Sequence, residues 1–188
     1  MKAMVRKIGI AVVIIFAVLM LQGTFLYLIG ARINTTRSIP VGLYWSVNRP
    51  IEKGGYVMFC PPQVQVFEQA RARGYIGSGM CPGGYGYMMK KVAGATNDRV
   101  DVGHDGVRVN GTLISLSKPM KEDGSARPMP RFQSNSYVLS EYQLLLLGDL
   151  NPLSFDGRYF GPVQRGQVRE VIVPVFTWGD NDSGGNHE

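Results

Sequence analysis

Apolar residues are distributed very unevenly along this chain. Residues Ile8–Ile29 form a run of 22 largely hydrophobic positions, in which Gln22 is the most polar residue. At about 1.5 Å of rise per residue, a helix of this length crosses roughly 30 Å of hydrocarbon. The run therefore predicts a transmembrane helix over residues 8–30, preceded by a short N-terminal segment of residues 1–7.

Beyond this run, short segments rich in Val, Ile, Tyr and Met alternate with Gly, Pro and Asn, a pattern typical of antiparallel strands. Only residues 64–73 have a helical periodicity. The turn pairs Asp105-Gly106 and Asn110-Gly111 favour positive φ and predict a three-stranded meander over residues 99–114. The predicted strands cover residues 54–59, 85–92, 99–102, 107–109, 112–114, 136–139 and 168–175.

The remaining segments carry no periodic pattern. Residues 117–133 are rich in Pro, Lys and Arg, and residues 179–188 form a polar tail. Neither composition predicts regular structure. About 150 residues follow the apolar run, which is the size of one ordinary domain. The sequence therefore predicts a mostly β, antiparallel domain over residues 31–178 behind one membrane anchor.

Basic residues flank the anchor on both sides. Lys2, Arg6 and Lys7 precede it, whereas Arg32 and Arg37 follow it. The positive-inside rule gives a small margin for a cytoplasmic N-terminus and an exported domain. A cleaved signal sequence would have a shorter apolar core and a small-residue cleavage site, and no such site precedes Arg32.

Two cysteines, Cys60 and Cys81, are the only ones in the chain. An even pair in an exported domain indicates a disulfide, which would enclose the predicted helix of residues 64–73. Closing a loop of about 20 residues stabilises a fold by roughly 3 kcal/mol when the effect is attributed to chain entropy. The alternative is a pair of free, buried thiols.

The net charge of +6 arises from 20 Lys and Arg against 14 Asp and Glu, spread along the chain. This distribution does not indicate nucleic-acid binding. A mild positive excess would help to hold the domain against an anionic leaflet, although an ordinary solvated surface explains it equally well.

Ser38 lies shortly after the anchor and is followed by Ile39-Pro40. The proline fixes its own φ and keeps the preceding residue extended, so the serine lies on a stiff, non-helical segment. Such a segment can present a hydroxyl group as a nucleophile, although an ordinary loop serine would have the same sequence.

Lys90 lies in a predicted strand, next to Lys91. Strand alternation places Lys90 and Met88 on one face and Lys91 on the other, so one lysine points inward or at a sheet edge. An inward amine is desolvated and loses its proton more readily, as a general base must. The alternative is a pair of solvated lysines that protect an edge strand.

Three segments together resemble the bacterial type I signal peptidases, and among them the TraF-like peptidases of conjugative transfer systems. The first has the sequence Ser-Ile-Pro-Val-Gly-Leu-Tyr, the second begins Lys-Lys-Val-Ala-Gly, and the third joins Gly-Asp to Ser-Phe-Asp-Gly-Arg. They cover residues 38–44, 90–100 and 148–162. The chain departs from the family pattern at Lys91, Asn97 and Gly157, and it lacks the Asn-Arg that usually follows Gly148-Asp149.

The resemblance implies roles for individual residues. Ser38 would be the nucleophile and Lys90 the general base, while the Ser38 backbone N–H and the Thr36 hydroxyl would stabilise the oxyanion. Ser154 would orient the lysine amine. Asp156, paired with Arg158, would be required either in the chemistry or to hold the loop, and Asp149 could serve similarly.

The resemblance also implies a function. The expected protein is a serine endopeptidase of the bacterial inner membrane, with its catalytic domain in the periplasm, that processes a pilin-type precursor for conjugative transfer through an acyl-enzyme. Water or the substrate's own amine would resolve that intermediate, giving a linear or a cyclic product. The expected partners are the membrane, the precursor and a conjugation or type IV secretion apparatus, and no cofactor, metal or nucleic acid is expected.

Other interpretations compete with this one. Ser115 and Lys118 fit the Ser-x-x-Lys pattern of penicillin-binding enzymes, but Pro119 follows at once and no helix is predicted there. A Ser-His-Asp triad would need His104 or His187, and neither lies in a suitable segment. The cysteines and histidines lack zinc-site spacing, and the glycines of residues 83–86 indicate a turn. A general leader peptidase and a non-enzymatic assembly factor also remain open.

Overall fold

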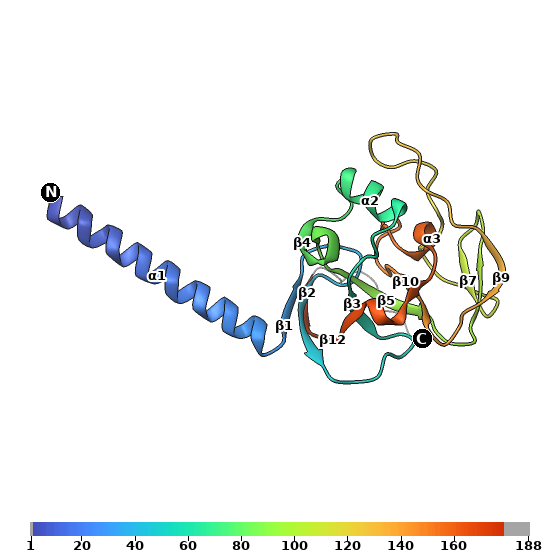
Figure 1. Ribbon diagram of the computed structural model, residues 1–188, viewed down its shortest axis with the longest axis horizontal. Coiled ribbons are helices and arrows are strands. Elements are labelled where there is room, and N and C mark those ends of the chain that lie inside the picture. Colours follow the sequence, from blue (N-terminus) through green and yellow to red (C-terminus); the bar gives the residue numbers. More distant parts are fainter. Residues whose placement is uncertain (1, 179–188) are drawn as a thin grey trace, which may run out of the picture.

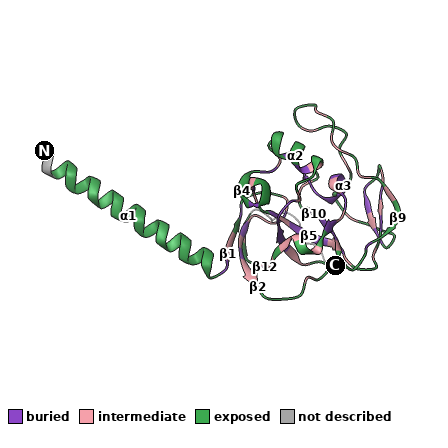
Figure 2. Ribbon diagram, in the orientation of Figure 1, coloured by how far each residue is buried: buried purple, intermediate pink, exposed green. Residues whose placement is uncertain are grey.

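The structure, a computed structural model, describes residues 2–178, so the predicted tail of residues 179–188 and His187 lie outside the described part. Helix α1 (Lys2–Leu28) projects from the domain as one long rod (Figure 1). Its residues from Met4 to Leu28 are exposed along the whole length (Figure 2) and form a helix long and apolar enough to cross a membrane. The predicted apolar helix is confirmed, and it ends at Leu28, two residues before the predicted boundary.

Antiparallel strands build the domain as two sheets, which confirms the predicted fold class. The larger sheet has the order β1-β2-β12-β3-β5-β10-β11, and the smaller sheet has the order β8-β7-β6-β9. Figure 1 places β7 and β9 at the end of the domain remote from α1. The strands of the larger sheet are β1 (Ala31–Asn34), β2 (Gly42–Val47), β3 (Tyr56–Phe59), β5 (Met88–Gly94), β10 (Gln143–Leu147), β11 (Val163–Gln164) and β12 (Val168–Thr177). Those of the smaller sheet are β6 (Arg99–Val102), β7 (Val107–Val109), β8 (Thr112–Leu113) and β9 (Ser134–Val138).

Each of the seven predicted strand segments contains a strand, whereas β1, β2, β4 (Ser78–Cys81), β10 and β11 were not predicted. The failure to predict β10 has a clear physical cause. Leu144 and Leu146 pack into the core of the larger sheet, while Leu145 and Leu147 pack under the smaller sheet. Because both faces of β10 are buried, its sequence is a continuous apolar run without the alternation that marks a half-buried strand.

The predicted meander is confirmed as β6-β7-β8, and β9 pairs with the other edge of β6. Asn110 and Gly111 both have positive φ, at 53° and 81°, and Gly106 has a φ of 147°. Asn97 also has a positive φ of 66°. Asparagine adopts this left-handed conformation more readily than other non-glycine residues, which explains how it can replace the glycine that the resemblance leads one to expect.

The predicted disulfide between Cys60 and Cys81 is present. It encloses helix α2 (Gln65–Ala72), which confirms the predicted helix and buries Phe67 and Ala70 against the core. A second short helix, α3 (Gly157–Phe160), lies within the third family segment, and 3₁₀ turns occupy Pro82–Gly84 and Arg165–Gln167. The loop of residues 117–133 contains no helix and no strand of either sheet, as predicted.

Candidate active site

Ser38 lies on the short connection between β1 and β2, which is fixed from two sides. The Asn34 side-chain nitrogen Nδ2 lies 2.7 Å from the Thr36 carbonyl oxygen and 3.0 Å from the carbonyl oxygens of Ile39 and Pro40. Ile39 is completely buried and packs in the core beside β2 and β12. A buried amide and a buried isoleucine therefore hold the loop on both sides of the serine. Asn34 was not predicted, because an asparagine near a turn carries no distinguishing sequence signal.

Lys90 lies in β5, between β3 and the C-terminal end of β10. Its side chain is on the buried face with Met88, and only 3% of the residue is exposed, whereas Lys91 lies on the opposite, half-buried face. The predicted alternation is confirmed. The pairing of β10 with β5 ends at Leu147 and Lys91, and the chain then loops back to bring Ser154 beside Lys90.

Three polar side chains meet at this point. The Lys90 ammonium nitrogen Nζ lies 2.7 Å from the Ser38 hydroxyl oxygen and 2.7 Å from the Ser154 hydroxyl oxygen. The two hydroxyl oxygens are 3.2 Å apart. Burial lowers the pKa of Lys90 to about 8, against the opposing effect of the Asp156 carboxylate. The amine is therefore close enough to exchange a proton with Ser38 and loses its own proton far more readily than a surface lysine.

Asp156 and Arg158 form a fully buried ion pair beside this cluster. The guanidinium donates from Nε and Nη2 to the two carboxylate oxygens, at 2.8 and 2.9 Å, and the Gly148 backbone N–H donates to Oδ2 at 2.8 Å. Within residues 2–178, Asp156 forms no hydrogen bond with Ser38 or Lys90. Its contacts are those of a residue that positions the surrounding loops, and they do not test its predicted catalytic role.

Gly148 and Asp149 bring their backbone against both serines. The Asp149 N–H donates to the Ser38 carbonyl oxygen at 2.9 Å. A Cβ atom on Gly148 would lie 2.4 Å from the Ser154 hydroxyl oxygen and 2.8 Å from the Ser38 carbonyl oxygen, so only glycine fits. The Asp149 carboxylate pairs with Lys91 at 3.1 Å and accepts a hydrogen bond from the Tyr56 hydroxyl at 2.9 Å. The Gly148-Asp149 dipeptide therefore fixes Ser38 through backbone contacts. The identity of the two side chains gives no sign of this role.

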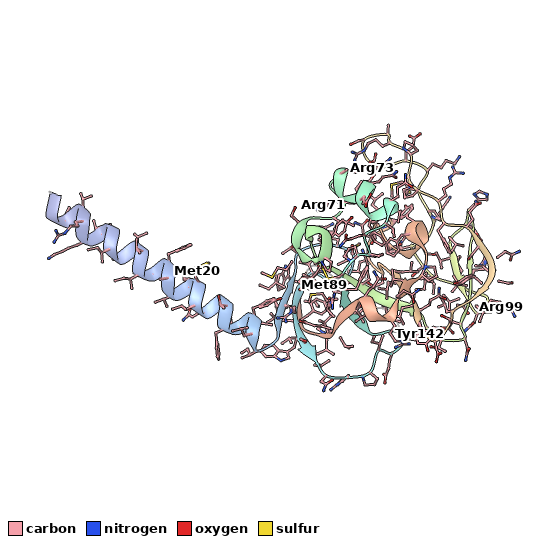
Figure 3. All side chains as sticks on the ribbon, viewed as in Figure 1. Met20, Arg71, Arg73, Met89, Arg99 and Tyr142 are labelled. Atoms are coloured by element: carbon pink, nitrogen blue, oxygen red, sulfur yellow. A yellow bond between two sulfur atoms is a disulfide. The ribbon has the colours of Figure 1, made fainter. Side chains whose placement is uncertain are left out.

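Two clefts meet at Ser38, and Thr36 lines both of them. One has a volume of about 290 Å³ and includes Ser154 and residues of the 117–133 loop. The other has a volume of about 210 Å³ and includes Ile33 and the residues Met88 and Met89 of β5; Met89 is labelled in Figure 3. Thr36 is exposed and its hydroxyl donates to the Asn34 side-chain oxygen at 3.0 Å. The Ser38 backbone N–H has no hydrogen-bond acceptor among residues 2–178.

The competing sequence interpretations gain no support from these contacts. Ser115 and Lys118 are both exposed and share no hydrogen bond in the described part of the chain. His104 is exposed on the turn between β6 and β7 and contacts no serine by a hydrogen bond there. Residues 2–178 also contain no group of three His, Cys, Asp or Glu side chains arranged to hold a metal ion.

The chain belongs to the signal peptidase family S26, because residues 1–177 match the family described as "Signal peptidase, peptidase S26". Two proteins from Escherichia coli, each called plasmid transfer protein TraF, are similar to it. One is 55% identical over 95% of this chain and 100% of its own, and the other is 59% identical over 86% and 91%.

More distant proteins are also similar to this chain. A probable conjugal transfer protein TraF from Sinorhizobium fredii is 37% identical over 79% of this chain and 78% of its own. A crystal structure of a signal peptidase I from Enterococcus faecalis V583 covers 68% of this chain and 100% of its own, with a TM-score of 0.40 and 19% identity. The predicted family is confirmed by the family match and by the TraF relatives.

Proposed function

We propose that this chain is a membrane-anchored serine endopeptidase in which Ser38 is the nucleophile and Lys90 the general base. The observation that carries this proposal is the 2.7 Å separation between the Lys90 amine and the Ser38 hydroxyl, within a site that buries the amine. A serine hydroxyl is a weak nucleophile until a neighbouring base takes its proton. A lysine can act as that base only if it is neutral, and burial favours its neutral form.

The proposed reaction begins when the Ser38 oxygen attacks the scissile carbonyl carbon and its proton moves to Lys90. The carbonyl oxygen becomes an oxyanion, and the Ser38 N–H and the Thr36 hydroxyl are the proposed donors to it. Because the Thr36 hydroxyl donates to Asn34 in the free protein, it must rotate to take part. Collapse of the intermediate breaks the peptide bond, Lys90 gives its proton to the leaving amine, and an acyl group stays on Ser38.

The remaining residues support this chemistry by position. Ser154 accepts one hydrogen bond from the Lys90 amine and thereby aims the nitrogen at Ser38. The Asp156–Arg158 pair holds the loop that carries Ser154, and Asp149 holds the Ser38 carbonyl through its backbone N–H. We assign these four residues to positioning and reserve the catalytic roles for Ser38, Lys90 and Thr36.

The anchor restricts the proposed substrate to the membrane surface. Ser38 lies nine positions after Ile29, so even an extended connection keeps the nucleophile within about 30 Å of the bilayer. The disulfide suits an oxidising compartment, which supports a periplasmic domain and a cytoplasmic N-terminus at the bacterial inner membrane. The names of the TraF relatives support conjugative transfer, and a small pilin-type membrane precursor is the proposed substrate.

Co-expression with candidate pilin precursors, followed by intact-mass measurement of the product, tests the proposal. Ser38→Ala and Lys90→Ala should each abolish processing while the protein still inserts into the membrane, and the exposed Ser115→Ala should process normally. Retained processing by either of the first two variants refutes the dyad. A product mass reduced by one water relative to the linear fragment identifies cyclisation, whereas the linear mass identifies hydrolysis.

A further inference from the structure

A cleft of about 820 Å³ lies beside the 117–133 loop, next to the smaller sheet, and its charged side chains are predominantly basic. Lys118, Lys121 and Arg131 line it together with His104, and Glu122 is its acidic residue. All five are exposed, and none forms an ion pair or a side-chain hydrogen bond within residues 2–178. Met120 and Phe132 add apolar surface between the charges. We call this site the basic cleft.

The basic cleft adjoins the cleft that contains Ser38, because Met120 and Glu122 line both. From there the path reaches the smaller cleft beside β5, which shares Ser38 with its neighbour. One extended polypeptide can therefore follow a single path from β5, past Ser38, to the basic cleft.

The segment that lines the basic cleft is hydrogen-bonded directly to helix α3, which follows Asp156. Arg158, which pairs with Asp156, also donates from Nη1 to the Leu116 carbonyl oxygen at 2.7 Å. The Met120 backbone N–H donates to the Tyr159 hydroxyl at 3.0 Å. Ser117 is buried, and its hydroxyl oxygen accepts from the Val107 N–H at 2.8 Å. The backbone that presents Lys118 is therefore held both by helix α3 and by the smaller sheet.

We propose that the basic cleft binds an acidic segment of the precursor whose scissile bond lies at Ser38, an inference that rests on the proposed function. The three cleft cations, which have no ion-pair partner among residues 2–178, offer complementary charge to Asp and Glu side chains, and the apolar residues between them accept aliphatic side chains. A membrane lipid is the less favoured ligand, because the basic cleft lies next to the smaller sheet, far from α1. In Figure 3, Met20 lies on α1 to one side of the domain and Arg99 on β6 lies at the opposite side of the domain, so the end that carries the smaller sheet points away from the bilayer around α1.

Fluorescence anisotropy on the full-length protein in neutral detergent micelles tests this proposal. The probe is a short fluorescein-labelled peptide of Glu, Leu and Gly, and Ser38→Ala is included throughout to prevent turnover. The cleft variant carries Lys118→Gln, Lys121→Gln and Arg131→Gln. A matched control carries Arg49→Gln, Arg99→Gln and Arg169→Gln, three exposed arginines outside the cleft, and both sets lower the net charge from +6 to +3.

The cleft variant should bind the peptide about tenfold more weakly than the parent, since each exposed ion pair contributes a fraction of a kcal/mol and three are lost. The control should stay within about twofold of the parent, because it leaves the three cleft pairs in place. Added salt should weaken binding by the parent, and a peptide with Lys in place of Glu should not bind.

Equal binding by the cleft variant and the control overturns the proposal. The proposal is also overturned if the cleft substitutions leave peptide binding intact and reduce the binding of phosphatidylglycerol in mixed micelles. That result identifies a lipid site. Precursor processing distinguishes this failure from failure of the proposed function. Processing lost with Ser38→Ala, alongside equal peptide binding, leaves the peptidase standing without the acidic subsite. Processing retained with Ser38→Ala removes the peptidase proposal itself.

Discussion

The pH dependence of Ser38 acylation follows from the burial of Lys90. Only the neutral amine can accept the serine proton, and burial lowers its pKa from 10.5 to about 8. At pH 7 the neutral fraction is then about 9%, whereas an ordinary lysine would be about 0.03% neutral. Burial alone therefore increases the active fraction roughly 300-fold at neutral pH. The acylation rate should rise about tenfold between pH 7 and pH 9 and then become constant.

Intact-mass measurement of Ser38 acylation by an activated peptide ester, quenched over time from pH 6 to pH 11, gives this profile. Lys90→Arg should abolish acylation at every pH, because a guanidinium stays protonated. Lys91→Gln, a change at the neighbouring lysine on the opposite face of β5, should leave the midpoint of the profile near pH 8. A rate independent of pH between 7 and 9, or one that keeps rising beyond pH 10, would refute the assignment of Lys90 as a buried general base.

The same pKa shift affects stability. Because the folded-state pKa of Lys90 lies below the unfolded value, the unfolded chain binds more protons between about pH 8 and pH 10.5. Stability should therefore rise with pH through this window, and protonated Lys90 should cost about 3 kcal/mol at neutral pH. Lys90→Met should remove that dependence and stabilise the fold. A denaturant midpoint for Lys90→Met at or below that of the parent at pH 7 would contradict this reasoning.

Three further predictions concern two residues that position the site and the disulfide. Gly148→Ala should abolish Ser38 acylation, because its Cβ would overlap the Ser154 hydroxyl, and unchanged acylation would show that the loop can yield. Asp156→Asn should destabilise the fold by about 3–5 kcal/mol in chemical denaturation, since it leaves Arg158 charged, buried and without its partner. Cys60→Ser should lower stability by about 3 kcal/mol, and a reducing agent should then lower the parent's melting temperature but not the variant's.

The local sequence was sufficient to predict the elements that depend only on neighbouring residues. The anchor follows from the length of one apolar run, and the β6-β7-β8 meander follows from two turn pairs. Alternation placed Lys90 and Lys91 on opposite faces of the strand, and the structure shows that Lys90 is on the buried one. Strands β1, β2 and β10 were not predicted, since β10 is buried on both faces and the other two resemble a linker after the anchor.

The sequence by itself determined the apolar N-terminal helix, the mostly β composition of the domain and, through three family segments, the residues that we propose carry the chemistry. Tertiary structure decided how those residues meet. Ser38 and Lys90 are 52 positions apart, and Ser154 lies 64 positions beyond Lys90, so their contacts depend on strand pairing across the larger sheet. The hydrogen bonds from Asn34 and from the Asp149 backbone N–H that hold the Ser38 loop were also visible only in the tertiary structure. A single polar side chain or backbone amide leaves no periodic pattern in a sequence.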